Sequence, residues 1–386
     1  MKKFLIIFGV ILLLILGAVW TYVFVYGVPK SADEVFARFS TTTPAPVFVG
    51  GESDSVVDVA DDEESDNGVQ SRLRQLTTRP TAGAGFIEGG IRYVERGTGH
   101  MYEIRLQGGE ERLISNTTYP HTIRADFSVG GEYVILMSEQ GVGMQSVLGK
   151  LVGGSTGELE MTSLPDGATE TGFAKAGDTL NFFVPNAGGG TAYAYSLNTG
   201  KTTELFRLPL TDVRIVWGLP TYVYTTPSAI STGYVYRVGK GGQLEYVTNG
   251  GKGLMAFPYA SGTLVSTIVD TDIVTRVVGQ RDLQLLKMLP EKCTVGSIDK
   301  KTLFCASPLT LDTSKVYPDD WYKGTVGFSD TLLRVGLASS TVTVLSLLEE
   351  ESGRPIDVEN IGANSVGSLI YLINKYDDTL WMYDLR

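Results

Sequence analysis

The chain contains few residues whose types and spacing suit catalysis. The segment Gly153-Gly-Ser155-Thr-Gly157 matches the nucleophile-elbow pattern, in which a serine stands on a sharp turn between a strand and a helix. Strand-like segments lie on both sides of this serine, so the sequence predicts a glycine-rich turn instead. The two histidines, His100 and His121, have no recognisable acidic partner, and a serine nucleophile needs a histidine that an acid orients.

Two pairs of adjacent carboxylates, Asp319-Asp320 and Asp377-Asp378, could supply the acid and the base of a glycosidase. Carboxylates in turns are usually only hydrated, so we expect no catalytic residue here. Two histidines cannot build a histidine-rich metal site, and the acidic segment lacks EF-hand spacing. The sequence therefore predicts no metal and no cofactor.

Residues 308–324 combine aromatic and acidic side chains. Tyrosine and tryptophan are enriched at binding hot spots, because they bury a large area while few rotamers are frozen. We therefore predict a binding element made of these residues: Tyr317, Asp319, Asp320, Trp321 and Tyr322. The alternative is that Trp321 folds back, plugging a channel or packing on a neighbouring element.

The two cysteines flank a predicted hairpin. Cys293 and Cys305 each lie six residues from Asp299, so a turn centred there places them directly opposite each other. Opposed residues in an antiparallel pair have Cα atoms about 4.5–5.5 Å apart, which a disulfide can bridge. We predict this bond, which requires an oxidising compartment. Two small buried thiols are the alternative.

Composition restricts the class of protein. An apolar content of 43% in 386 residues is enough for a large core and rules out wholesale disorder. A net charge of −11 argues against a nucleic-acid partner, because such binding depends on neutralising phosphates. The 46 glycines favour many tight turns and hence many short strands.

The first 70 residues predict where in the cell the protein is located. Phe4 to Tyr26 is uncharged and long enough to span a bilayer, so residues 1–30 are expected to be a transmembrane anchor. A cleaved signal peptide is the alternative. Residues 31–39 begin with a capping-box pattern and predict a short juxtamembrane helix. Residues 40–70 carry eight acidic and no basic side chains and predict a disordered linker.

A repeated unit occupies residues 71–386. It consists of a strand, a polar turn, a strand ending near an aromatic residue, a tight turn and another strand. Its anchor residues are 41, 46, 44, 40, 38 and 66 positions apart: Phe86, Phe127, Phe173, Trp217, Phe257, Val295 and Ile361. Units of about 40–45 residues with four short strands are typical of propeller blades. The sequence predicts an all-β, seven-bladed β-propeller, with six or eight blades as alternatives.

Two further details of the ring follow from the repeat. Residues 72–77 align with 111–115, an outer strand, and residues 379–385 have the pattern of a third strand. We expect the N-terminal strand to complete the last blade and remove an open edge. The 66-residue spacing places an insertion in blade 6, between Cys305 on the second strand and residues 326–328 on the third. Loops of this kind share one face with the connections between blades, so it should project beside residues 77–80, 96–99 and 116–121.

Residues 71–386 resemble the β-propeller superfamily, most closely the TolB-like propellers of bacterial envelopes. The segment Leu380-Trp-Met-Tyr-Asp-Leu385 is similar to their strand motifs. Residues 92–103 and 317–324 are similar to segments of uncharacterised membrane-anchored propellers from small-genome bacteria. TolB itself is soluble and carries a different N-terminal domain, so the resemblance does not supply a partner.

We therefore expect a single-pass protein of the cytoplasmic membrane, with its propeller on the extracytoplasmic side. Its expected role is that of a non-catalytic binding or scaffold module for a protein or an envelope glycan. A glycan-acting enzyme with its site at the mouth of the propeller channel is the alternative.

Overall fold

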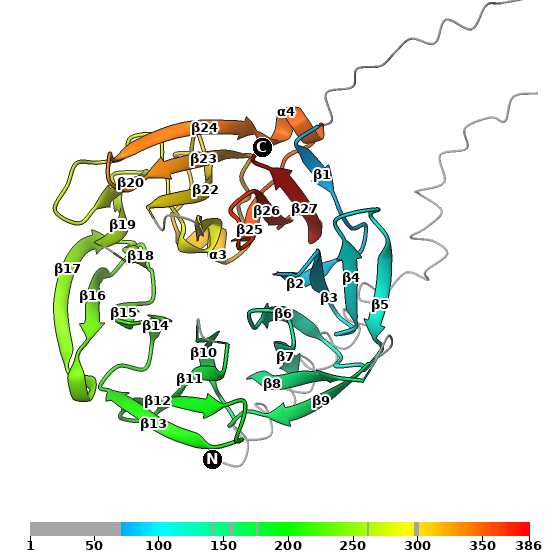
Figure 1. Cartoon of the computed structure of the whole chain (residues 1–386). Coiled ribbons are helices and arrows are strands. Elements are labelled where there is room, and N and C mark those ends of the chain that lie inside the picture. Colours follow the sequence, from blue (N-terminus) through cyan, green and yellow to red (C-terminus); the bar gives the residue numbers. More distant parts are fainter. Residues whose placement is uncertain (1–70, 141–142, 154–156, 175–176, 261, 297–300) are drawn as a thin grey trace, which may run out of the picture. The chain divides into compact units, whose positions relative to one another are not determined.

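The computed structural model describes residues 71–386 except 141–142, 154–156, 175–176, 261 and 297–300. Seven antiparallel sheets are arranged in a ring around a central opening (Figure 1). This arrangement confirms the predicted all-β, seven-bladed propeller. The predicted anchor (1–30), helix (31–39) and linker (40–70) lie outside the described residues, as does Ser155. In the part that is described, no helix has the length and apolar character needed to cross a membrane.

The blades follow one another along the chain, and each begins with its innermost strand. Blade 1 contains β2 (Thr81–Ile87), β3 (Gly90–Glu95), β4 (Met101–Arg105) and β5 (Glu111–Ser115); blade 2 contains β6 (Thr122–Phe127), β7 (Tyr133–Gln140), β8 (Gly143–Val152) and β9 (Glu158–Ser163); blade 3 contains β10 (Thr169–Phe173), β11 (Thr179–Asn186), β12 (Gly189–Ser196) and β13 (Thr202–Leu208); blade 4 contains β14 (Val213–Val216), β15 (Tyr222–Thr225), β16 (Thr232–Val238) and β17 (Leu244–Lys252). Blade 5 contains β18 (Met255–Tyr259), β19 (Gly262–Val269) and β20 (Asp272–Val277); blade 6 contains β21 (Cys293–Val295), β22 (Thr302–Pro308), β23 (Asp330–Gly336) and β24 (Thr341–Leu347); blade 7 contains β25 (Val358–Ala363), β26 (Leu369–Asn374), β27 (Thr379–Asp384) and β1 (Leu73–Gln75). Short helices η1 (Lys240–Gly242), η2 (Pro290–Lys292), α3 (Asp319–Tyr322) and α4 (Leu348–Ser352) lie in the connections.

Central strands are apolar on both faces because each blade is packed between two others. In β7, Val134 and Leu136 are buried with Met101 of blade 1, whereas Ile135 between them is buried with Phe182 of blade 3. Fully burying one such side chain contributes about 1.5–3 kcal/mol. The core is therefore a ring of interblade clusters.

The inner strands approach each other closely around the axis. A Cβ atom added to Gly83 in β2 would lie 1.8 Å from the backbone oxygen of Ala125 in β6. Only glycine fits at this contact, which brings the first two blades together.

The ring closes as predicted. Strand β1 pairs antiparallel with β27, so an N-terminal strand forms the outer edge of the C-terminal blade. Leu73 of β1 is buried in the cluster that contains Trp381 and Tyr383 of β27. The pairing covers an edge that would otherwise present free backbone groups.

Blade 5 departs from the four-strand prediction, since its described sheet has three strands. An irregular segment runs along the edge of β20, where the Leu283 amide donates to the Thr275 carbonyl at 2.7 Å. Leu283, Leu286 and Met288 are buried with the core of blades 5 and 6. This segment therefore takes the place of the outer strand. Buried apolar side chains, rather than a full ladder of backbone hydrogen bonds with β20, hold it against the blade.

The disulfide prediction is confirmed. Cys293 of β21 and Cys305 of β22 are register partners, with Cα atoms 4.1 Å apart, and their sulfur atoms are bonded. The connecting turn at residues 297–300 lies outside the described residues.

Candidate functional site

The insertion of blade 6 comprises residues 309–329 between β22 and β23, and it contains α3. The third strand begins at Asp330 rather than at residues 326–328, because Phe328 is buried in the core below the insertion. Helix α3 lies beside the central opening in Figure 1. The insertion is therefore a candidate for shaping the mouth of the channel.

Hydrogen bonds fix the insertion to three blades. Asp319 Oδ1 accepts from the Ala229 amide in the β15–β16 loop of blade 4, at 2.7 Å. The Tyr322 hydroxyl donates to Glu291 of η2, at the start of blade 6, at 3.1 and 3.2 Å. Lys375 Nζ, in the β26–β27 loop of blade 7, donates to the Trp321 carbonyl. These partners belong to blades 4, 6 and 7, whereas the sequence placed the insertion beside loops of blades 1 and 2.

The structure brings the five predicted binding residues together, but two of their rings face inward. Tyr317 and Trp321 are only 2% and 4% exposed. Their ring centroids lie 5.8 and 6.4 Å from that of Phe328. Trp321 is thus a packing residue, as in the alternative considered from the sequence. A contact between these two rings and a partner stays a prediction.

The other three predicted residues remain partly exposed. Asp320 Oδ2 accepts from the Val316 amide at 2.8 Å and so closes the turn that leads into α3. Burial, followed by the negative charge of Glu291, raises the pKa of Tyr322 well above its ordinary value. The Tyr322 hydroxyl therefore stays protonated and acts as a donor at neutral pH.

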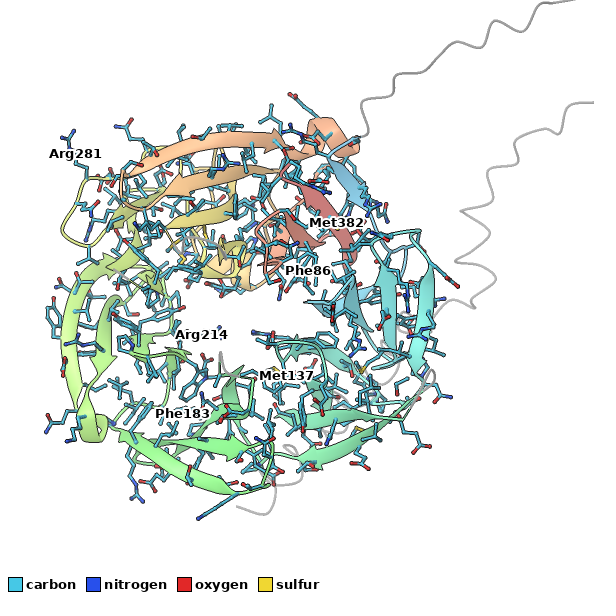
Figure 2. The ribbon with its side chains drawn as sticks, viewed as in Figure 1. Phe86, Met137, Phe183, Arg214, Arg281 and Met382 are labelled. Atoms are coloured by element: carbon cyan, nitrogen blue, oxygen red, sulfur yellow. A yellow bond between two sulfur atoms is a disulfide. The ribbon has the colours of Figure 1, made fainter. Side chains whose placement is uncertain are left out.

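Charged side chains of the inner strands line the channel near this insertion. Glu170 of β10 pairs with Arg214 of β14 at 3.2 Å, and its second oxygen accepts from the Ile215 amide at 2.9 Å. Arg124 and Asp126 of β6 pair at 3.2 Å. Arg124 interacts electrostatically with Glu170 and Glu291, yet 52% of its side chain is exposed. Solvent thus reaches a charged lining deep in the ring, and Figure 2 places Arg214 and Phe86 on opposite sides of the opening.

A second charged group lies where blades 7 and 1 meet. Arg96, from the β3–β4 loop, is 3.1 Å from both Glu359 of β25 and Asp378 of the β26–β27 loop. Burial raises the pKa of both carboxyls, and Arg96 opposes that rise. Repulsion from Asp378 raises the pKa of Glu359 further. Glu359 and Asp378 both have a raised pKa, and both pair with the guanidinium of Arg96.

Sequence reasoning missed the channel lining, because its members come from separate blades and form no motif. Glu170, Arg214 and Glu359 are each the second residue of an innermost strand. The available signal was a charged residue at this position in blades 3, 4 and 7, where blades 1, 2 and 5 have an apolar residue. Of the adjacent carboxylates noted in the sequence, Asp378 belongs to this group, whereas Asp377 pairs with Arg354 at 2.8 Å. Among the described residues, no group of three or more His, Cys, Asp or Glu side chains is placed to hold a metal ion.

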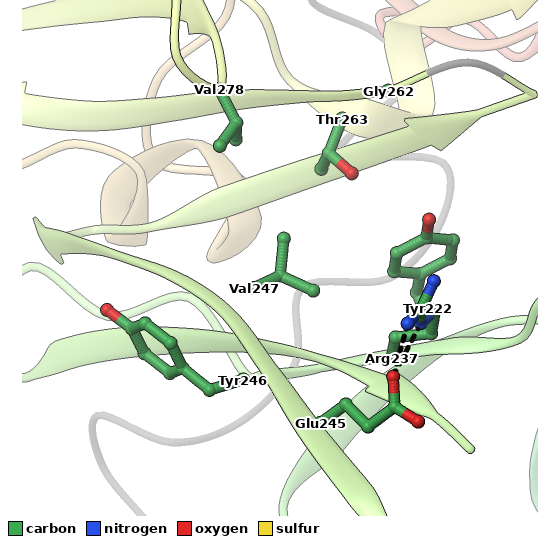
Figure 3. A pocket seen from close by; sticks show the side chains of 8 residues that line it. All are labelled: Tyr222, Arg237, Glu245, Tyr246, Val247, Gly262, Thr263 and Val278. Carbon is green, nitrogen blue, oxygen red and sulfur yellow. Dashed lines mark hydrogen bonds and ion pairs between the residues drawn. The ribbon is translucent and has the colours of Figure 1, made fainter. Parts of the chain in front are cut away.

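A cleft of about 320 Å³ lies between blades 4 and 5 (Figure 3). Its lining includes Tyr222, Tyr246 and the ion pair between Arg237 and Glu245. These residues belong to β15, β16 and β17, at strand ends opposite to those that bear the insertion. The cleft is thus separate from the channel mouth.

Comparisons with known proteins identify the fold. No protein-family model matches the chain, and no curated protein sequence matches it. Oligogalacturonate lyase from Vibrio parahaemolyticus is 9% identical over 83% of this chain and 95% of its own, with a TM-score of 0.53. Streptogramin B lyase is 13% identical over 81% of this chain and 97% of its own, with a TM-score of 0.51. The chain thus has the fold of the β-propeller superfamily.

The likeness to TolB is weaker in structure. TolB from Acinetobacter baumannii is 11% identical over 78% of this chain and 64% of its own, with a TM-score of 0.40. This score does not single out TolB among propellers. At these identities the likeness to any of these proteins is one of fold alone.

Proposed function

We propose that this chain is a non-catalytic, membrane-tethered binding module, which binds a protein or an envelope glycan at the mouth of its channel. The observation that carries the proposal is the docked insertion. Its contacts with blades 4, 6 and 7 hold Asp319 and Tyr322 in fixed positions next to a charged channel. Loops presented by a rigid scaffold commonly carry binding function, and a fixed surface loses little entropy when it binds.

The chemistry of the mouth fits a polar ligand. Arginine and carboxylate groups alternate there, and Arg214, Glu170 and Tyr322 all present hydrogen-bonding atoms. Because the cations and anions are paired with each other, the lining favours neutral hydroxyls or mixed-charge peptide segments over a strongly anionic polymer. A glycan or a polar loop of a protein has this chemistry.

The membrane part of the proposal rests on sequence and on the disulfide. Phe4 to Tyr26 is an uncharged run of spanning length. The Cys293–Cys305 bond fits an oxidising compartment. Protease added to intact spheroplasts should release a soluble fragment that begins near residues 40–85. Full protection of that fragment would reject the extracytoplasmic topology.

Matched arginine variants test the binding surface. Arg214 pairs with a glutamate of the adjacent blade 3 at the channel, and Arg237 pairs with a glutamate of the neighbouring strand at the cleft between blades 4 and 5. The assay is cross-linking capture from membranes, together with binding to purified envelope glycans. The proposal expects Arg214→Ala to lose the ligand and Arg237→Ala to keep it. Equal binding by both folded variants would contradict it.

The carboxyls at Arg96 favour a second candidate, a glycan-acting enzyme. A carboxyl with a raised pKa can donate a proton to a leaving group, and a neighbouring carboxylate can assist. Glu359 and Asp378 have this relationship. New reducing ends released from an envelope glycan, and absent with Glu359→Gln, would establish the enzyme and replace the non-catalytic proposal.

A further inference from the structure

Three ionisable side chains are buried together beneath the insertion. Lys292 ends η2, Asp330 begins β23, and Asp357 precedes β25. Lys292 Nζ donates to Asp330 Oδ2 and to Asp357 Oδ1. All three side chains are 0% exposed. Elements of blades 6 and 7 thus bring an amine and two carboxyl groups into contact, away from solvent.

Aromatic rings enclose this group. The centroids of Trp321 and Phe328 lie 5.1 and 4.9 Å from Lys292 Nζ. The Trp321 indole Nε1 donates to both oxygens of Asp357 at 3.1 Å. The indole therefore fixes one carboxylate, and the rings fill the space around the amine. A second amine, Lys375 Nζ, lies 3.9 Å from the centroid of the Trp321 ring.

The two oxygens of Asp330 have different surroundings. Oδ2 accepts from the Val358 amide at 2.8 Å as well as from Lys292. Oδ1 is buried and has no hydrogen-bond partner in the structure. Burial raises the pKa of Asp330 to about 6, against the opposing effect of Lys292. A buried carboxyl oxygen without a hydrogen-bond partner lowers the stability of the folded state.

We propose that Lys292 and Asp330 condense to form an intramolecular isopeptide bond, with Asp357 as the acid–base residue. The contact between Lys292 Nζ and Asp330 places nucleophile and electrophile together in a fixed frame. Such positioning reaches effective molarities of about 10⁵ M or more in intramolecular reactions.

The reaction balances with water as its second product. Lys292 Nζ first transfers a proton to Asp330 Oδ2, the oxygen to which it donates, which gives a neutral amine and a neutral carboxylic acid. The nitrogen lone pair attacks Cγ of Asp330, and the carbonyl electrons move to Oδ1. Asp357, which also accepts from Lys292 Nζ, takes a proton from the nitrogen and delivers it to the Oδ2 hydroxyl, which leaves as water. No oxidant, reductant or co-reactant is required.

The bond would remove buried charge from the cluster. One lysine and two aspartates carry a net negative charge when all are ionised, and desolvating such charges is expensive. Condensation eliminates the Lys292–Asp330 pair of charges, and it leaves Asp357 hydrogen-bonded to Trp321. The new bond would also close a ring over residues 292–330, which includes the insertion.

Mass spectrometry of the full chain tests the bond. The protein is unfolded, reduced and alkylated, so that the disulfide does not contribute. We expect the intact mass to be lower than the sequence mass by one water molecule. Trypsin cannot cleave after an amide-linked lysine, so peptide 288–300 should appear joined to peptide 324–334 through Lys292 and Asp330. A wild-type chain with the unshifted mass, and with cleavage after Lys292, would overturn the proposal.

Controls separate the bond from ordinary ion pairing. Lys287 pairs with Asp272, a carboxylate whose side chain is 55% exposed, and this pair should yield no branched peptide. Lys292→Arg and Asp330→Ala should restore the unshifted mass. Asp357→Asn should also lack the bond, and a linked Asp357→Asn chain would rule out its assigned role. Formation of the Cys293–Cys305 disulfide, measured before reduction, shows that each variant has folded.

Discussion

Leu73 and Tyr383 lie opposite each other in the ladder between β1 and β27, although 310 positions separate them in the chain. The pair joins the first described strand to the last one and completes blade 7. Both side chains are buried in the same cluster, at 3% and 1% exposure. Closure of the ring thus depends on apolar packing as well as on backbone pairing.

Leu73→Ala should destabilise the propeller by about 2–5 kcal/mol, because a buried leucine is replaced by a cavity at the closure. Urea unfolding followed by tryptophan fluorescence measures the change. Arg74→Ala, in the same strand but exposed, is the control and should have little effect. Equal destabilisation by the two variants would show that the Leu73 side chain is not what closes the ring.

Trp321→Ala should lower stability by about 3–5 kcal/mol, since it empties a packed site and removes the indole donor from Asp357. Tyr322→Phe removes only a hydroxyl that donates to the Glu291 carboxylate and should cost about 1.5–3 kcal/mol. Thermal unfolding of both variants gives the comparison. If Trp321→Ala kept full stability but lost ligand binding, the ring would be a recognition element, as first expected from the sequence.

Reduction of Cys293–Cys305 should cost about 2–4 kcal/mol, mainly by releasing the unfolded chain from a constraint. The Cys293→Ser, Cys305→Ser double variant should behave like the reduced protein. Denaturant titration with and without reductant measures the loss in the wild type. Reductant should leave the double variant unchanged, and any further loss there would point to a different cause.

Glu359 should make stability depend on pH. Burial raises the pKa of its carboxyl above the ordinary value of 4.5, so the folded state binds this proton more tightly than the unfolded chain does. The contribution of Glu359 therefore favours folding at low pH and is lost as the pH rises through the interval above 4.5. Glu359→Gln should flatten this part of the stability profile. An unchanged slope would mean that Glu359 ionises normally in the fold.

The sequence predicted features that repeat or that depend on short spacing. The blade number followed from the anchor residues, closure from the alignment of residues 72–77, and the disulfide from its symmetric position around Asp299. Each of these is a local pattern or a register. They required no knowledge of how separate blades meet.

The remaining features arise from contacts between distant parts of the chain. The Glu170–Arg214 pair and the Lys292 cluster join different repeats, and no spacing rule connects their members. In blade 5 a segment anchored by Leu283 and Met288 takes the place of a fourth strand. The sequence placed Trp321 in the correct insertion. Its ring faces inward because it packs on Phe328 and donates to the buried carboxylate of Asp357.

The position of β1 has a mechanical consequence. This strand is the described element nearest in sequence to residues 1–70, and only three residue pairs join it to β27. A tensile load applied through the N-terminal segment would therefore reach the ring at its seam. The force would be resisted by the short β1–β27 ladder and by the Thr77 hydroxyl, which accepts from the Leu380 amide at 3.0 Å. Under such a load we expect the propeller to begin to open at this seam rather than within a complete blade.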